Sequence, residues 1–509
     1  MSVFKMKQSK KIQFPKKNFH ISKKKSIILC TNKRKNNIYI NYSNWRSGMK
    51  KVLVINTGGT IGMIHIEKGN PLSPLKPAED WNEIAASYPL LNNFDTGYIQ
   101  VNELIDSSDM NPNIWIEIAQ IIEKNYNKYC GFVVLHGTDT MAFTASALSF
   151  MLNNLSKPVI LTGSQVPLEN PRSDALQNLV TAIQIAGSEL YNINLVPEVS
   201  IFFRDHLLRG NRSRKLDASN YYGFSTPNYP NLGVAGSEIK IDSSNIRKPS
   251  KKEFFVDYSM DTNVLVFDIF PGFNPEILKK IFKSNDIKGL ILKTYGNGNA
   301  PTSDAFVSVI EEIVKSDVTV VNISQCPTGM VKMGLYDAST RLLDAGVVSG
   351  MDLTPEAAIA KLMHLLGKGM DRKSIGEAIQ LDICGEQSLD LLTYRLDNAN
   401  EGVLSKSFEV SLSKKVDPSK IKRTRFRVRN ISSSDPIDLS VTIKGETKLP
   451  LKNSIKTLTR DGKTADFLIS FDHSTTQILE KSTKIYFNIE SKRKISWDRV
   501  VFEIFIDKH

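Results

Sequence analysis

The sequence predicts two α/β domains with parallel sheets, followed by an all-β sandwich. Short apolar runs alternate with helical periodicity from residue 51 to about residue 390, and a polar stretch at 242–253 divides them into two groups. From about residue 392, runs with period two follow one another without helices. The length of 509 residues agrees with about three domains of roughly 150 residues each.

The first α/β domain is expected at residues 49–250. Its strands are predicted where β-branched and aromatic residues cluster, in KVLVINT (51–57), FVVLHG (132–137), VILTGS (159–164) and VSIFFRD (199–205). Helical periodicity lies between them, at 114–126, 141–155 and 179–190. This alternation predicts a parallel sheet that helices cover on both faces.

A second, smaller α/β domain is expected at residues 262–391. Its predicted strands are VLVFDIF (264–270), GLILKTYG (289–296) and TVVNISQC (319–326). The domain closes with a helix at 355–368, and Pro355 suits the first turn of that helix because its fixed φ matches helical geometry.

The C-terminal β-sandwich is expected at residues 395–509, where turn-rich breaks separate about six strands. These strands are SFEVSLS (407–413), TRFRVRN (424–430), IDLSVTIKG (437–445), ADFLISFD (465–472), KIYFNIE (484–490) and DRVVFEIFID (498–507). We interpret this domain as an interaction or shielding module.

The N-terminal residues 1–48 form a basic leader that contains no acidic residue. They hold 13 of the 66 Lys and Arg residues, so residues 49–509 carry equal numbers of basic and acidic side chains. We expect a disordered extension, or sequence upstream of a start at Met49. An organelle-targeting leader and a nucleic-acid-binding arm are the alternatives. The neutral body argues against a nucleic acid as partner.

Cysteine spacing and the length of the apolar runs exclude several kinds of site and location. The four cysteines are far apart and form no C-x-x-C motif: Cys30, Cys130, Cys326 and Cys384. We therefore expect no metal site, no disulfide framework and a cytoplasmic location. No apolar run approaches the roughly 18 residues that a membrane span requires, so no membrane association is expected.

Polar motifs follow several of the predicted strands. They are TGGTIGM (57–63), IDSSDM (105–110), HGTDTM (136–141) and RGNRSRK (209–215). In an open α/β sheet, ligands bind beyond the carboxyl ends of the strands, so these motifs should share one cleft. Taken alone, each motif is also compatible with a tight turn that carries a capping Thr or Asp, and an isolated Lys is usually a solvated surface charge.

Hydroxyl, carboxylate and amine groups from these motifs supply the parts of an activated threonine nucleophile. Thr60 and Thr138 supply hydroxyls, Asp139 a carboxylate and Lys215 an amine. A hydroxyl is a weak nucleophile until a neighbouring base takes its proton. The combination therefore favours nucleophilic catalysis, and no dinucleotide motif is present.

Together with YGNGNAP (295–301), these motifs resemble the bacterial-type L-asparaginases, most closely their type I cytoplasmic branch. The resemblance covers about residues 49–390 and does not include the β-sandwich. It implies a two-domain α/β enzyme, a homodimer or homotetramer, that hydrolyses L-asparagine to L-aspartate and ammonia without metal or cofactor.

The resemblance also implies roles for individual residues. Thr60 is similar to the nucleophile that forms a β-aspartyl ester, and Thr138, Asp139 and Lys215 resemble a second catalytic triad in which Lys215 helps deprotonate Thr138. Asp139 is further expected to bind the substrate ammonium. Ser107 and Ser108 would hold its α-carboxylate, and Asn299 would reach an active site from the smaller domain.

Two features depart from the family pattern: Arg214 and Lys293 replace residues expected around an allosteric asparagine site, and a lid tyrosine is missing. The family commonly carries a Tyr about ten residues beyond the nucleophile, on a mobile lid, and this chain has Asn70 there. The nearest tyrosine, Tyr88, lies in a segment that looks helical. The missing Tyr leaves open an asparagine-binding protein without turnover. A second alternative is the amidase subunit of a glutamyl-tRNA amidotransferase, which uses the same Thr, Thr, Asp and Lys set and carries an extra β domain.

Overall fold

A computed structural model describes most of the chain. The described residues are 50–67, 73–78, 80–284, 286–334, 337–397, 400–411, 420–431, 437–445, 451–457, 465–471, 484–497 and 499–507. The predicted basic leader and Asn70 lie outside these ranges. Of the helices in the described part, none combines the length and apolar character that a membrane span needs.

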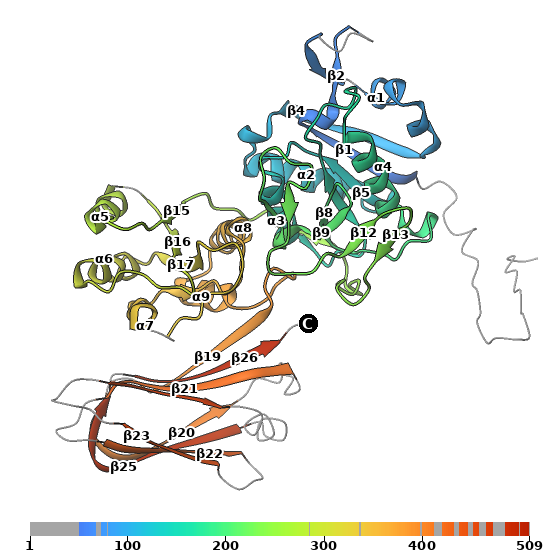
Figure 1. Ribbon diagram of the computed structural model, residues 1–509. Helices are drawn as coiled ribbons and strands as arrows, with labels where there is room; N and C mark the ends of the chain where they lie inside the picture. Colours follow the sequence, from blue (N-terminus) through green and yellow to red (C-terminus); the bar gives the residue numbers. More distant parts are fainter. Residues whose placement is uncertain are drawn as a thin grey trace, which may run out of the picture. The chain divides into compact units, whose positions relative to one another are not determined.

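The first domain is built on an eight-stranded sheet with the order β13-β12-β9-β8-β7-β5-β1-β4 (Figure 1). Five neighbouring strands are parallel: β4 (Thr96–Ile105), β1 (Lys50–Gly58), β5 (Tyr129–Leu135), β7 (Val159–Thr162) and β8 (Val199–Phe203). The other three are antiparallel: β9 (His206–Arg209), β12 (Gly233–Ala235) and β13 (Ile239–Ile241). Strands β1, β5, β7 and β8 confirm the four strands predicted for this domain.

Helices pack on both faces of this sheet because successive residues of each strand point to opposite sides. Helices α2 (Pro112–Asn125) and α3 (Met141–Met151) pack with Leu53 and Ile55 of β1. Helix α4 (Ala175–Ala186) packs with Val52 and Val54 on the other face. The predicted two-sided coverage is confirmed.

Small elements surround this sheet. A hairpin of β2 (Met63–His65) and β3 (Leu75–Pro77) follows β1 and precedes the short helix α1 (Trp81–Ser87). Two-stranded pairs are formed by β10 (Arg214–Lys215) with β11 (Phe224–Ser225), and by β6 (Leu152–Asn153) with β14 (Phe255–Val256). Pairing β10 with β11 fixes the backbone at Lys215.

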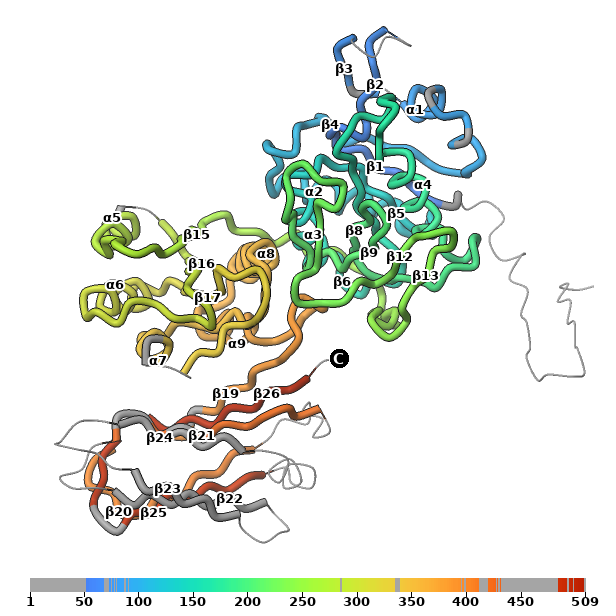
Figure 2. Tube along the Cα trace, in the orientation of Figure 1, coloured from blue at the N-terminus to red at the C-terminus, as the bar shows by residue number. Residues whose placement is uncertain are grey.

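The smaller domain contains the parallel sheet β15-β16-β17-β18, which lies between two groups of helices (Figures 1 and 2). The strands are β15 (Val264–Asp268), β16 (Gly289–Thr294), β17 (Thr319–Ser324) and β18 (Val348–Ser349). One face packs on α5 (Pro275–Ser284), α6 (Asp304–Lys315) and α7 (Asp337–Asp344), and the other on α8 (Pro355–Gly367) and α9 (Arg372–Ile379). Pro355 occupies the first turn of α8, as predicted.

The C-terminal region forms two four-stranded antiparallel sheets. One has the order β19-β26-β21-β24, with β19 (Leu389–Asp397), β26 (Arg499–Asp507), β21 (Ile421–Ile431) and β24 (Ala465–Phe471). The other has the order β20-β25-β22-β23, with β20 (Asn400–Ser411), β25 (Lys484–Trp497), β22 (Ile437–Gly445) and β23 (Leu451–Thr457). Rings of Phe426, Phe487 and Phe502 pack between the sheets, with centroids 4.7 to 4.9 Å apart.

This architecture confirms the predicted fold class of two α/β domains with parallel sheets and a mostly antiparallel C-terminal region. Several strands are additions to the predicted set, among them β4, β9, β12, β13, β18, β19 and β23. Because β9, β12 and β13 pair antiparallel, the first sheet is parallel only in part. Strand β19 starts at Leu389, so its first residues belong to the sandwich as well as to the range expected for the smaller domain.

Candidate active site

The ends of β1, β4 and β5 converge so closely that only glycine fits at three positions. A Cβ atom added at Gly58 would lie 2.2 Å from the Ile105 carbonyl oxygen, and one at Gly59 would lie 2.4 Å from the Gly137 nitrogen. Gly58 and Gly59 also have φ values of 109° and 79°, which side chains rarely adopt. The turn that carries Thr60 is therefore pressed against the turn that carries Thr138.

Gly137 makes a third close approach, and its substitution should disturb the site. A Cβ at Gly137 would lie 2.6 Å from Ser107 Oγ, so we expect Gly137→Ala to displace Ser107 and lower kcat/KM for the substrate at least about 100-fold, or roughly 2.7 kcal/mol. Gly236→Ala is the matched control, because nothing lies within 4 Å of its added Cβ. Equal kinetics for the two variants would contradict the close packing of these turns.

Thr138, Asp139 and Lys215 come together as the sequence predicts. Lys215 Nζ donates hydrogen bonds to Thr138 Oγ1 at 2.8 Å and to Asp139 Oδ1 at 2.7 Å. The Lys215 side chain is only 16% exposed, whereas the Asp139 side chain is 66% exposed. The amine therefore links a half-buried hydroxyl to a carboxylate at the mouth of the site.

Buried ion pairs hold the loop that carries Lys215. Arg209 pairs with Glu198 through an Nε to Oε2 distance of 2.6 Å, and Arg212 pairs with Asp352 of the smaller domain at 2.9 Å. Both pairs are almost completely buried, so loss of one partner would leave an uncompensated charge. Two of the three arginines of the RGNRSRK motif, Arg209 and Arg212, thus have a structural role that the sequence did not indicate.

Ser107 and Ser108 lie in one short turn after β4. Ser107 is 4% exposed, and its carbonyl oxygen accepts a hydrogen bond from Thr140 Oγ1 at 2.6 Å. Ser108 is exposed, and its hydroxyl donates to Asp106 Oδ1 at 2.8 Å. Hydrogen bonds from the Ser108 backbone and hydroxyl lower the pKa of Asp106.

Gln165 is a polar residue of this site that the sequence analysis missed. It follows β7 directly, and Thr138 Oγ1 lies 3.4 Å from its Oε1 atom. Its Nε2 donates to the Asn220 carbonyl at 2.9 Å. Its place just after VILTGS was the available signal, because this strand ends at the same edge of the sheet as β1 and β5.

A buried relay fixes the loop immediately before Thr138. Trp115 Nε1 donates to Thr144 Oγ1 at 2.9 Å, and Thr144 Oγ1 lies 2.8 Å from His136 Nε2. The Gly137 carbonyl can only accept, so the Nδ1 atom of His136, 2.6 Å away, donates to it. Burial lowers the pKa of His136 to about 4, so the ring is neutral near pH 7. In the neutral ring Nε2 accepts the hydrogen bond from the Thr144 hydroxyl.

Burial makes His136 a source of pH-dependent stability. It lowers the pKa of His136 from 6.5 to about 4, so the unfolded state takes up this proton more readily than the folded state. Stability is complete above pH 6.5 and is lost as pH falls toward 4, by on the order of 3 kcal/mol. Urea unfolding should show a shallower pH dependence for His136→Gln over this window. An unchanged pH dependence would contradict the assignment.

Thr60, Asn299 and Tyr88 take no part in the hydrogen bonds of Lys215 with Thr138 and Asp139. Thr60 is half-buried and begins the short helical turn Thr60–Gly62 that follows β1. Asn299 lies in the smaller domain, where its backbone pairs with Tyr295, and no recorded contact of the described residues joins it to Thr138 or Lys215. Tyr88 donates its hydroxyl to the Leu168 carbonyl, and burial raises its pKa.

Within the described ranges, His, Cys, Asp and Glu side chains form no group of three or more that could hold a metal ion. The chemistry that the described side chains offer is that of a threonine hydroxyl beside an amine and a carboxylate, a combination suited to nucleophilic attack on a carbonyl carbon.

Comparisons with known proteins match the two α/β domains. The family "Asparaginase, N-terminal" matches residues 51–247, and "Glutaminase/Asparaginase C-terminal domain" matches residues 263–379. L-asparaginase 1 of Escherichia coli K12 is 40% identical over 348 residues, which cover 67% of this chain and 99% of that protein. The 60 kDa lysophospholipase of Mus musculus is 37% identical over 369 residues, covering 67% of this chain and 63% of that protein.

Solved structures agree with these matches. L-asparaginase I from Vibrio cholerae has a TM-score of 0.60 and 39% identity, and the alignment covers 67% of this chain and 99% of that one. The thermostable L-asparaginase from Thermococcus kodakarensis has a TM-score of 0.60 and 30% identity, with 66% and 98% covered. The chain therefore belongs to the asparaginase family, in agreement with the type I resemblance of its motifs.

Proposed function

We propose that this protein hydrolyses L-asparagine to L-aspartate and ammonia. Family membership supports the reaction class. The observation that carries the proposal is the position of Lys215 Nζ, within hydrogen-bond distance of both Thr138 Oγ1 and Asp139 Oδ1 at the strand ends that also carry Thr60. An amine, a hydroxyl and a carboxylate at one edge of the sheet are what a threonine amidohydrolase requires.

The proposed reaction has two steps. In the first, Thr60 Oγ attacks the side-chain amide carbon, loses its proton and forms a β-aspartyl ester, while the amide nitrogen gains a proton and leaves as ammonia. In the second, water attacks the ester, returns a proton to Thr60 and releases L-aspartate. In this scheme Thr138 and Lys215 move protons between the reacting groups and solvent.

The substrate's charged groups fit the surrounding side chains. The exposed carboxylate of Asp139 suits the α-ammonium. The Ser107 hydroxyl suits the α-carboxylate, and the Ser108 hydroxyl would exchange its hydrogen bond to Asp106 for one to the α-carboxylate. Backbone N–H groups near Thr138 are suited to the oxyanion that forms during attack, an effect worth roughly 3 to 4 kcal/mol per donor in acyl-transfer enzymes.

Asn299 enters the proposal through a second subunit. Its Oδ1 atom is buried and lacks a hydrogen-bond partner among the described residues. A homodimer or homotetramer would allow this side chain to meet a neighbouring subunit's substrate. We place the enzyme in the cytoplasm.

Ammonia release by the full chain tests this function. We expect many turnovers per chain with L-asparagine and no requirement for tRNA. A need for glutamyl-tRNA would instead support an amidotransferase subunit. Saturable asparagine binding without ammonia release would support a binding protein. Either result would overturn the proposal. Glutamine should be assayed in parallel, because one methylene changes selectivity by only about 1 to 3 kcal/mol.

A further inference from the structure

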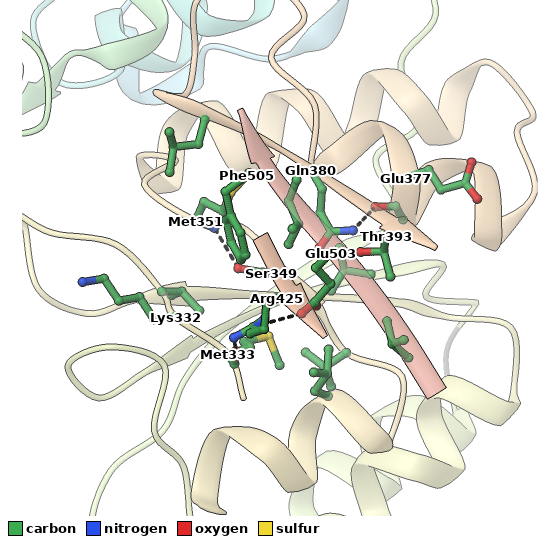
Figure 3. A pocket seen from close by; sticks show the side chains of 18 of the residues that line it. Lys332, Met333, Ser349, Met351, Glu377, Gln380, Thr393, Arg425, Glu503 and Phe505 are labelled. Carbon is green, nitrogen blue, oxygen red and sulfur yellow. Dashed lines mark hydrogen bonds and ion pairs between the residues drawn. The ribbon is translucent and has the colours of Figure 1, made fainter. Parts of the chain in front are cut away.

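A cavity of about 730 Å³ lies where the smaller domain meets the sheet that contains β19, β26 and β21 (Figure 3). Its volume is typical of small-molecule sites, which range from roughly 300 to 1,000 Å³. None of the residues proposed for asparagine hydrolysis lines it. The cavity therefore requires an explanation separate from the active site.

Strand register explains which side chains the sandwich contributes. Leu391 of β19 pairs with Phe505 of β26, which pairs in turn with Arg423 of β21. Thr393, Glu503 and Arg425 form the next row of the same ladder. Because alternate residues of a strand share one face, these six side chains form a single surface opposite the aromatic core of the sandwich.

Much of the cavity wall is apolar. Met351 of the smaller domain packs with Leu391 and Phe505 in one buried cluster. Val331, Met333 and Val347 are also buried and line the same cavity. Such a wall favours a ligand with a hydrocarbon or aromatic body, because burial of apolar surface is the main favourable term in such binding.

The charges at this surface are not balanced. Seven basic and four acidic residues line the cavity. Arg425 is buried and satisfied, since it pairs with Glu503 and donates from Nη1 to the Met333 carbonyl at 2.9 Å. Figure 3 shows these two contacts beside Phe505.

Arg423 has no such partner. Its guanidinium carbon lies 4.4 Å from the centre of the Phe505 ring, and it forms no ion pair with any described carboxylate. Partial burial and the neighbouring charge of Arg425 lower the pKa of Arg423, and the attraction of Glu503 offsets only part of this effect. An anion placed between Arg423 and the cavity would compensate this charge and accept hydrogen bonds from its planar N–H groups.

We infer that this cavity binds a small amphipathic organic anion, with a carboxylate at Arg423 and an apolar body against Met351, Leu391 and Phe505. The apolar wall and the charge of Arg423 are separate observations. The wall comes from both domains, whereas Arg423 belongs to β21. The site depends on the sandwich, because three of these four residues, Leu391, Arg423 and Phe505, belong to its strands.

Calorimetric titration of the full chain with decanoate tests the inference. We expect saturable binding of one molecule per chain with a Kd below about 100 μM. Decanol, which lacks the charge, and decyltrimethylammonium, which reverses it, should bind at least about tenfold more weakly. Equal binding of decanol and decanoate would overturn the requirement for an anion.

Variants locate the binding to this cavity. Arg423→Gln should weaken decanoate binding at least about tenfold, whereas Arg423→Lys, which keeps a positive charge, should weaken it less. Lys494→Gln, at an exposed position of β25, is the charge control and should bind like the wild type. Thr393→Trp places a bulky side chain at an exposed position of the cavity wall and should block binding.

An active-site variant and thermal unfolding serve as two further controls for decanoate binding. Lys215→Met should bind decanoate with unchanged Kd, because Lys215 does not line the cavity. Thermal unfolding of each variant establishes that the protein is folded. Wild-type affinity in folded Arg423→Gln or in folded Thr393→Trp would overturn the assignment of the site.

Discussion

Replacing Thr60 with Ala is expected to lower kcat for L-asparagine at least about 1,000-fold, or roughly 4 kcal/mol, without unfolding the protein. The physical reason is the loss of the only oxygen that can form the proposed ester at this position. Thr60 is half-buried in a short turn and its hydroxyl packs in no described core cluster, so removing it should cost little stability.

The control for this prediction is Thr60→Ser, which keeps the hydroxyl and should retain much more activity than Thr60→Ala. Steady-state ammonia release and thermal unfolding are measured on the same preparations. If folded Thr60→Ala kept more than about a tenth of the wild-type kcat, a loss below roughly 1.4 kcal/mol, Thr60 would not be the nucleophile.

Lys215→Met is expected to lower kcat by about 100-fold to 10,000-fold, the usual range for a positioned group that transfers protons. Met matches the length of the aliphatic chain but removes the amine that contacts Thr138 and Asp139. Lys215→Arg should not restore activity, because a guanidinium keeps its proton and cannot accept the one that Thr138 loses.

Comparing Lys215→Met with Lys215→Arg shows whether Lys215 transfers a proton or serves only as a fixed positive charge. Full activity in Lys215→Arg would mean that position 215 needs only a positive charge near Thr138. Lys240→Arg, at an exposed position of β13 on the far edge of the sheet, serves as the control for exchange of a lysine for an arginine. The measurement is kcat across pH, because a base and a fixed charge predict different pH profiles.

Much of this fold could be predicted because its strands are strongly apolar and its turns carry glycine. FVVLHG and VILTGS correspond to fully buried parallel strands, and such strands have a pronounced apolar signal. Strand β4 was missed because TGYIQVNELI mixes polar and apolar residues, as suits an edge strand that is only partly buried.

The active-site set could be predicted for a related reason. Thr138 and Asp139 follow β5 directly, so the topology of a parallel sheet already brings them toward Thr60. Lys215 lies beyond the β8 and β9 hairpin, and its placement depends on two buried arginine pairs, one of which joins Arg212 to Asp352 of the smaller domain. Such pairs cannot be predicted from local pattern.

Other long-range contacts could not be predicted from the sequence either. Lys361 is part of a helix that the sequence predicts well, but its charge is fully buried and pairs with Glu386 at 2.6 Å. An isolated lysine in an apolar helix would normally be assigned to the solvent-exposed face. The contact of Arg425 with Met333 likewise joins two domains across 92 residues of sequence.

Chemical trapping of the proposed ester tests the central claim most directly. Wild-type protein is mixed with L-asparagine, quenched in acid during turnover, digested and examined by mass spectrometry. We predict that the peptide containing Thr60 gains the mass of asparagine less ammonia, and that Thr60→Ala shows no adduct. An adduct on Thr138 in place of Thr60 would contradict the proposed mechanism.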